Sequence, residues 1–309
     1  MKQYEPEKII SVSHLSKSYG KVKAVSDVSF YVEAGKLFAF LGPNGAGKST
    51  TINTICTFLK PDEGEVIVNG HHLGKEDDKI RKSIGVVFQE NLLDELLTVE
   101  ENLLLRGGFY GMEKRELKEA VKRVTEDVQL GSFIKRPYGK LSGGQKRRAD
   151  IARALIHTPE ILFLDEPTTG LDPQTRKNVW DIIKRLQKER GMTVFLTTHY
   201  MEEAEEADYC IVVDEGKIAA KGTPFELKER YAADRLLLKG KQPGLLEAEL
   251  EQRKMKYKKT AEIFEIELED TMAALPVLNE LKDYLQDFSV IKGTMDDVFI
   301  GITGKEIRE

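Results

Sequence analysis

The sequence predicts an α/β protein with a mainly parallel sheet. The continuous apolar run Leu37–Leu41 is typical of a buried parallel strand. A glycine-rich loop and then a helix-forming segment follow it. Strands and helices are predicted to alternate along residues 161–214, as in parallel sheets with helical crossovers. The 309 residues, 40% hydrophobic and 32% charged, suffice for one large or two medium globular domains.

The first half of the chain combines short strands with a helical insertion. Strands separated by glycine turns are predicted at residues 9–15, 24–32, 36–41 and 65–68. From residue 98 to 156, apolar residues recur at helical spacing among many charges. This pattern predicts a helical subdomain at about residues 90–157, inserted into the α/β core.

The second half returns to alternation and then changes character. Strands are predicted at 161–165, 193–197 and 209–214, with helices at 173–189 and 201–207. Beyond residue 231 the predicted order is a strand at 235–238, a helix at 244–251, an alternating strand at 262–268, an amphipathic helix at 273–285 and a strand at 288–291. We therefore expect an α/β domain at 1–230 and a small α+β domain at 231–309.

Composition narrows the possible partners. The net charge is −5, from 47 Lys and Arg against 52 Asp and Glu, so nothing points to nucleic acid as a partner. The apolar stretches are far shorter than the ~20 residues of a membrane-spanning helix. The two cysteines, Cys56 and Cys210, fall inside predicted elements and are expected to be reduced core residues. These features indicate a cytoplasmic protein.

The strongest chemical signal is a phosphate-binding loop, the run Gly42-Pro43-Asn44-Gly45-Ala46-Gly47-Lys48-Ser49-Thr50, which fits G-x-x-x-x-G-K-[ST]. Glycines let successive backbone N–H groups point at anionic oxygens, and the helix after the loop offers its positive end. Lys48 supplies a charge for the β- and γ-phosphates, and Ser49 supplies a hydroxyl for Mg²⁺. The strand before the loop and the helix after it favour this site over a flexible glycine turn.

The run Ile161-Leu162-Phe163-Leu164-Asp165-Glu166 is a second signal. Four apolar residues followed by two acids indicate a buried strand whose carboxyl end reaches the nucleotide. Asp165 is expected to hold the hydration shell of Mg²⁺, and Glu166 to polarise the water that attacks the γ-phosphate. The alternative is an ordinary strand end whose acids lie in solvent.

The run Leu141-Ser142-Gly143-Gly144-Gln145, followed by a predicted helix, is a third signal. A turn of small residues at a helix N-terminus is a second potential phosphate site. One phosphate-binding loop already serves one nucleotide, so the second site makes most sense if it serves a nucleotide held by another copy. The basic run Lys146–Arg148 on this helix is expected to be solvated or to face phosphate.

Together these three motifs resemble one family, the ATP-binding cassette (ABC) ATPases, over roughly residues 8–230. The resemblance implies a P-loop ATPase core with an antiparallel β subdomain and the inserted helical subdomain. It also implies ATP and Mg²⁺, and two domains that meet head to tail around two ATP molecules. Ser142, Gly143 and Gly144, with Gln145 in the same motif, would then contact the nucleotide held by Lys48 of a second copy.

Four further residues match positions of the family pattern. Tyr19 matches the aromatic residue that stacks on adenine, although it could be a core tyrosine of a hairpin. Gln89 matches the glutamine that touches Mg²⁺ and the attacking water, although it could be a surface amide. Asp172 matches the loop that crosses the dimer interface, and it can also be the N-cap of the next helix. His199 matches the switch histidine that contacts the γ-phosphate.

The resemblance also implies a role in transport. A separate transmembrane permease would complete the transporter, with this chain peripheral on the inner face of the cell membrane. Residues 91–101, rich in Leu and acids, are the expected docking surface, or else ordinary subdomain core. The end of the chain, residues 291–304, is similar to the tail of daunorubicin-resistance exporter ATPases, which implies export of drugs, antibiotics or other small hydrophobic compounds. The alternative is a soluble ABC ATPase that acts on ribosomes or nucleic acid.

Overall fold

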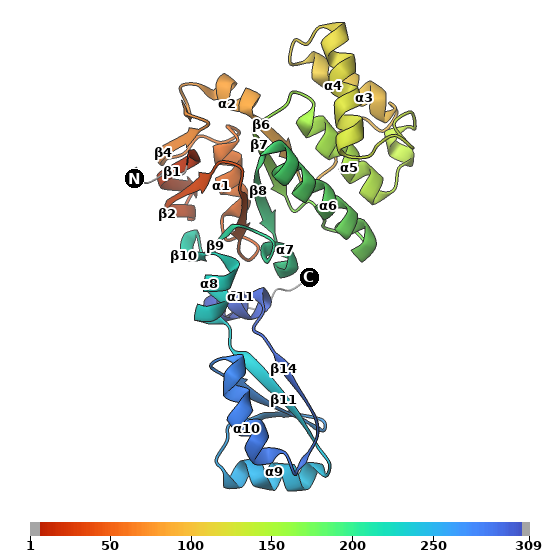
Figure 1. Ribbon diagram of the computed structural model, residues 1–309. Helices are drawn as coiled ribbons and strands as arrows, with labels where there is room; N and C mark the ends of the chain where they lie inside the picture. The colour runs from red at the N-terminus through yellow and green to blue at the C-terminus, as the bar shows by residue number, and fades with distance from the viewer. Residues whose placement is uncertain (1–6, 305–309) are drawn as a thin grey trace, which may run out of the picture. The chain divides into compact units, whose positions relative to one another are not determined.

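The chain divides into two compact units, and the computed structural model describes residues 7–304 of it (Figure 1). Unit 1 comprises residues 1–221 and unit 2 comprises residues 222–309. The division lies before helix α8 (Pro224–Tyr231), whereas the sequence predicted it after residue 230. The reason is that α8 packs against α11 (Met295–Thr303), near the C-terminal end of unit 2.

The centre of unit 1 is a six-stranded sheet. Its strands are, in spatial order, β10 (Lys217–Gly222), β9 (Tyr209–Asp214), β3 (Leu37–Leu41), β8 (Thr193–Thr198), β7 (Ile161–Asp165) and β6 (Ile84–Val87). The pairs β9–β3, β3–β8, β8–β7 and β7–β6 are parallel. All residues of β3, β8 and β6 are buried, as expected where both faces of a parallel sheet are covered. The predicted α/β class is confirmed.

A second sheet of unit 1 is antiparallel. It has the order β2 (Val22–Glu33), β1 (Lys8–Tyr19), β4 (Glu63–Val68) and β5 (His71–His72). Aromatic rings pack it against the central sheet: Phe30 of β2 stacks on Phe38 of β3 at 5.6 Å, and Phe38 lies 5.0 Å from Phe195 of β8. This core fixes β3, the strand that ends at the glycine-rich loop. Cys56 and Cys210 are buried free thiols, as predicted.

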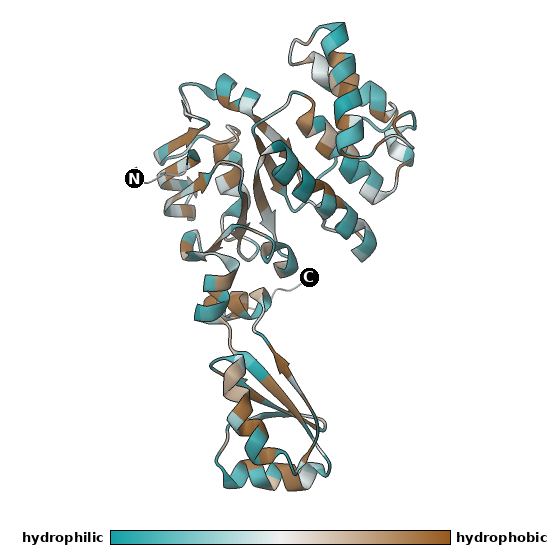
Figure 2. Ribbon diagram, viewed as in Figure 1, coloured by the Kyte–Doolittle hydropathy of each residue, from teal (hydrophilic) through white to brown (hydrophobic). Residues whose placement is uncertain are grey.

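Helices complete unit 1. They are α1 (Lys48–Ile55), α2 (Asp77–Ser83), α3 (Val99–Gly108), α4 (Lys114–Asp127), η1 (Tyr138–Lys140), α5 (Gly143–Leu155), α6 (Pro173–Arg190) and α7 (Met201–Ala204). Helices α3, α4 and α5 contact one another and form the predicted helical subdomain. Figure 2 shows the strands of the central sheet as mainly apolar and the helices as striped with polar residues. Within residues 7–304, no helix combines the length and the apolar character needed to span a membrane.

Unit 2 is an antiparallel sheet covered by helices. The strand order is β12 (Lys258–Thr260), β13 (Ile263–Leu268), β11 (Asp234–Gly240) and β14 (Leu285–Ile291). The helical segments here are α9 (Pro243–Gln252), η2 (Thr271–Ala273) and α10 (Ala274–Leu281). The helix predicted at 273–285 is too long, because Leu285 pairs with Gly240 in the sheet. Helix α11, which the sequence did not predict, begins at a capping box formed by Thr294 and Asp297.

Candidate active site

The glycine-rich loop lies between β3 and α1. Gly47 has a φ of 101°, a backbone conformation that favours glycine, and a Cβ on it would lie 2.3 Å from the carbonyl oxygen of Ala24. Helix α1 begins at the next residue, Lys48, and no side chain caps its N-terminus. The loop therefore presents a helix N-terminus with free N–H groups, which is suited to an anion.

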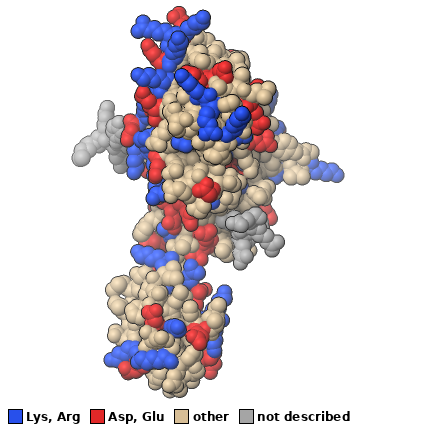
Figure 3. Space-filling model, turned by 90° about the vertical axis from the view of Figure 1, so that its right-hand side faces the viewer, with Lys and Arg blue, Asp and Glu red and all other residues tan. Residues whose placement is uncertain are grey.

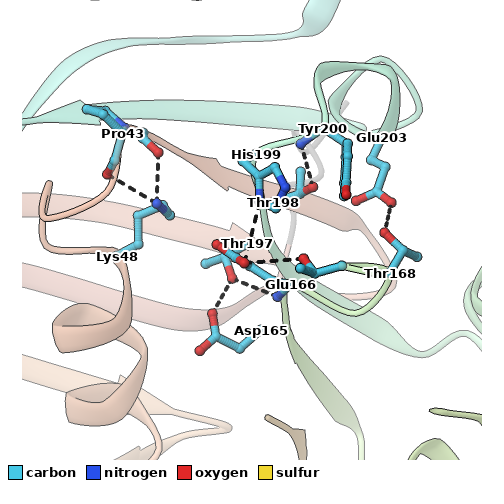
Figure 4. Close-up of polar contacts among 12 residues, drawn as sticks. Pro43, Lys48, Asp165, Glu166, Thr168, Thr197, Thr198, His199, Tyr200 and Glu203 are labelled. Carbon is cyan, nitrogen blue, oxygen red and sulfur yellow. Dashed lines mark hydrogen bonds and ion pairs between the residues drawn. The ribbon is translucent and has the colours of Figure 1, made fainter. Parts of the chain in front are cut away.

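Lys48 points back into this loop. Its side chain is buried, and Nζ donates hydrogen bonds to the carbonyl oxygens of Gly42 at 2.8 Å and Pro43 at 3.2 Å (Figure 4). Burial lowers the pKa of Lys48, while the charges of Glu166 and Asp165 oppose that shift. The ammonium group is thus held at the loop predicted to bind phosphate, within electrostatic reach of both predicted acids.

The two acids lie at the end of β7, at the carboxyl edge of the sheet. Asp165 Oδ1 accepts a hydrogen bond from the Thr197 hydroxyl of β8 at 2.5 Å. Burial raises the pKa of Asp165, and the charge of Glu166 raises it further. Glu166 has a φ of 46°, which is uncommon for a residue with a side chain, and its N–H donates to the Thr197 carbonyl at 3.1 Å. Such a conformation is held by its surroundings and occurs often at functional sites.

His199 lies beside Glu166, in the segment after β8. Its Nδ1 is 3.4 Å from Glu166 Oε2. The Thr169 hydroxyl donates to the same carboxylate oxygen at 3.3 Å. The structure therefore brings Lys48, Asp165, Glu166 and His199 to one edge of the parallel sheet, although they are far apart in the sequence (Figure 4).

Arg147 belongs to this region, contrary to the expectation of a solvated or phosphate-facing run at Lys146–Arg148. It is only 5% exposed. Its Nη1 donates to the Phe88 carbonyl at 2.6 Å, next to Gln89, and its Nη2 donates to the Glu166 carbonyl at 2.9 Å. The guanidinium thus joins α5 to the ends of β6 and β7. Sequence reasoning missed it because a basic residue on a polar helix gives no sign of burial.

The Ser142–Gln145 motif forms the start of α5. Ser142 is the N-cap, and its hydroxyl accepts a hydrogen bond from the Gln145 N–H at 3.4 Å, while Gln145 Oε1 accepts from the Ser142 N–H at 3.2 Å. A Cβ on Gly144 would lie 2.0 Å from the Thr175 side chain of α6, so only glycine allows this approach. Ser142 and Gly143 remain exposed.

Asp172, Tyr19 and Gln89 lie around these groups. Asp172 is the N-cap of α6 and accepts from the Thr175 N–H at 3.0 Å, and bonds from Thr175 lower its pKa. Tyr19 is half-exposed at the end of β1, and Gln89 is exposed just after β6. Within residues 7–304, no hydrogen bond or ion pair joins Tyr19, Gln89 or Ser142 to the cluster around Lys48.

Comparison with known proteins agrees with this arrangement. Residues 25–169 match the family described as "ABC transporter", and residues 222–303 match the family "ATP-binding protein DrrA1-3-like, C-terminal domain". The daunorubicin/doxorubicin resistance ATP-binding protein DrrA of Streptomyces peucetius is 38% identical over 311 residues, which cover 97% of this chain and 94% of that protein. The chain belongs to the ATP-binding proteins of ABC transporters. It is an ABC ATPase, which binds and hydrolyses ATP.

Other relatives support the same assignment. The linearmycin resistance ATP-binding protein LnrL of Bacillus subtilis is 36% identical, with 97% of this chain and 100% of that protein covered. Among solved structures, the dimeric cassette MJ0796 superimposes with a TM-score of 0.63 at 32% identity, over 69% of this chain and 98% of that chain. The resemblance to ABC ATPases predicted from the three motifs is confirmed, and so is the likeness of the C-terminal part to that of the daunorubicin-resistance proteins.

Proposed function

We propose that two copies of this ATPase enclose two ATP molecules, and that their closing and reopening drive a separate membrane permease. The expected assembly is an exporter of drugs, antibiotics or other small hydrophobic compounds. One arrangement carries this proposal: the N-termini of α1 and α5 are both suited to an anion, and Figure 1 draws these two helices apart with β7 and β8 between them. A single chain therefore offers each nucleotide only half of its contacts.

In this dimer, each ATP would lie on the Gly42–Thr50 loop of one copy and against the exposed Ser142 and Gly143 of the other. The phosphates would take the place of the two loop carbonyls as partners of the Lys48 ammonium. Tyr19, exposed at the end of β1, would stack on the adenine. Asp172 would lie at the interface, because it caps the helix against which α5 packs.

Hydrolysis is assigned to Glu166 and His199. The Glu166 carboxylate would accept a proton from the attacking water, and His199, 3.4 Å from that carboxylate, would orient it and contact the γ-phosphate. Removal of the γ-phosphate takes away the group that both copies hold, so the dimer reopens.

The acids also suit Mg²⁺. Burial and the charge of Glu166 raise the pKa of Asp165, so a nearby divalent cation would favour its ionised form. The hydroxyl of Ser49 and the amide oxygen of Gln89 would add oxygen ligands of the kind that Mg²⁺ prefers. Bound Mg²⁺ would neutralise phosphate charge. The fit of Asp165, Ser49 and Gln89 to this ion rests on the oxygen atoms that they offer and on the partial burial of Asp165.

Residues 91–101 are proposed as the docking surface for the permease. Leu96 is 89% exposed and Leu92 is also exposed, whereas Leu93 and Val99 are buried. The segment thus anchors itself with one set of apolar side chains and presents another to a partner. It begins two residues after Gln89, so docking there can influence the active site.

The names of the relatives support export over the alternative role on ribosomes or nucleic acid. Besides the two resistance proteins, a Nod factor export ATP-binding protein I from Rhizobium sp. is 44% identical over 223 residues. Figure 3 shows basic and acidic side chains interspersed on the face it draws of each unit, whereas nucleic-acid binding favours a stripe of one sign. We propose a location at the inner face of the cell membrane, beside the permease.

A cell-based experiment tests this function. The natural copy is replaced by Glu166→Gln, or by Glu189→Gln as a matched control on the exposed part of α6. Cells with Glu166→Gln should retain more of a fluorescent amphipathic drug than control cells, because the transporter is not powered. Equal retention across a panel of such drugs would contradict an exporter of this class.

A further inference from the structure

Two segments of unit 1 run side by side at the candidate active site. Contacts between pairs of side chains, here called rungs, join the two segments at successive positions. One segment covers the end of β7 and the loop after it, residues 165–172, and the other spans the end of β8 and α7, residues 197–204. The first rung joins Asp165 to Thr197 at 2.5 Å, and the second joins Glu166 to His199 at 3.4 Å. Figure 4 shows these pairs in order along the two segments.

A third rung lies beyond the Glu166–His199 pair, on the side opposite the Asp165–Thr197 contact. The hydroxyl of Thr168 donates a short hydrogen bond to Glu203 Oε1 (Figure 4). Thr168 is fully buried and Glu203 is only 3% exposed, whereas the neighbouring Glu202 is exposed. No motif in the sequence drew attention to either residue of this bond.

Burial of this carboxylate carries a cost in stability. Glu203 Oε2 is buried and has no hydrogen-bond partner within residues 7–304. An unpaired polar atom in the interior costs more free energy than an apolar side chain of similar size. Such costs are frequent at functional sites, where a fixed geometry matters more than stability.

We propose that Glu203 is a positioning residue for hydrolysis. Its bond to Thr168 ties α7 to the loop that starts at Glu166. The Glu166–His199 pair then lies between the Asp165–Thr197 rung and the rung that Glu203 forms. These two contacts hold the left-handed backbone at Glu166 from either side. The inference rests on the proposed roles of Glu166 and His199, which the third rung would keep aligned for proton transfer.

The same bond reaches the proposed dimer interface. The Leu171 N–H donates to the Thr168 carbonyl at 3.1 Å, and Asp172 follows as the N-cap of α6. A second contact joins α6 to the residue that precedes α7, because the Arg176 guanidinium of α6 lies 3.8 Å from the ring centroid of Tyr200. A shift of His199 would therefore be transmitted to residues 168–172.

Steady-state kinetics on four variants test the proposal. Glu203→Gln replaces the carboxyl group by an amide, and Thr168→Val removes the hydroxyl donor. Each should lower kcat at least tenfold while the KM for ATP stays within about twofold, because small displacements of reacting groups reduce rates strongly. Thr168→Ser, which keeps the hydroxyl, and Glu202→Gln should stay within about twofold of the natural chain.

The double variant separates a shared bond from two independent effects. Glu203→Gln with Thr168→Val should be no slower than the slower single variant, because both changes break one interaction. The proposal would be overturned if the reduction in kcat of the double variant equalled the product of the reductions in the two single variants. An unchanged kcat in both single variants would also overturn it. Loss of ATP binding in both singles would also overturn it, since the bond would then serve folding.

Glu166→Gln in the same assay separates this inference from the proposed function. If Glu166→Gln is inactive and the Glu203 and Thr168 variants are fully active, only the positioning role fails. If Glu166→Gln turns over like the natural chain, the proposed catalytic role of Glu166 fails first.

Discussion

Fully buried charged side chains occur in unit 1, whereas the described charged side chains of unit 2 are all at least partly exposed. Among the described residues, the buried charged side chains are Lys48, Arg147, Asp150 and Glu203, all of unit 1. The core of unit 2 is apolar, formed by residues such as Leu238 and Phe264.

The ion pairs of unit 2 lie outside its core. Arg253, for example, bonds Glu280 at 2.6 Å with both side chains partly exposed. Buried charge costs stability, and Lys48 and Arg147 carry this cost at the candidate active site.

Loss of the proposed catalytic base should have the largest effect and should leave both folds intact. Glu166→Gln removes the proposed base, which is worth about 10²–10⁴ in rate, so we expect turnover to fall at least about 100-fold. ATP affinity should be nearly unchanged, because the loop and Lys48 remain. Phosphate release and equilibrium ATP titration measure the two quantities. A turnover similar to that of Glu189→Gln would remove Glu166 from the mechanism.

Damage to the core of unit 2 should affect stability without affecting chemistry. Phe264 is fully buried, and Phe264→Ala should destabilise unit 2 by about 3–5 kcal/mol. Hydrogen exchange of β11 and β13 would report the loss, while the ATP turnover of the chain should stay within about twofold. The neighbouring Ile263 is exposed, so Ile263→Ala is the matched control. If ATP turnover falls in proportion to the loss of stability of unit 2, the stability of this unit and the chemistry of unit 1 are not independent.

Acid should destabilise unit 1 through a partly buried histidine. His157 follows α5, stacks on Tyr110 at 4.0 Å and bonds the Ile84 carbonyl through Nε2 at 3.0 Å. Burial lowers the pKa of His157 from 6.5 to about 4. Between these values the unfolded chain takes up a proton that the folded chain does not. The stabilisation is therefore complete above pH 6.5 and is lost as the pH falls towards 4, by up to about 3 kcal/mol.

Urea unfolding at several pH values checks this prediction. His157→Phe keeps a ring against Tyr110 but cannot titrate, so its stability should fall less between pH 6.5 and 4. If the free energy of unfolding of His157→Phe falls with pH as steeply as that of the natural chain, His157 is not the source of the acid sensitivity.

The sequence predicted those parts of the site that are local in the chain. The loop around Lys48 and the acids at the end of β7 are contiguous motifs with a fixed neighbourhood. Arg147 and Glu203 were missed because their burial depends on segments far away in the sequence, at Phe88 and Thr168. Helix periodicity failed for the same reason near Leu285, where pairing with Gly240 replaces a helical turn. Tertiary contacts decided each of these positions.

The central claim is that ATP joins two copies through Lys48 of one chain and Ser142 of the other. Glu166→Gln should trap this state, so its molar mass by light scattering, with saturating Mg-ATP, should be twice that of one chain. With ADP the mass should return to that of a single chain. A mass of one chain at every concentration of Mg-ATP, with ATP binding intact, would contradict the account.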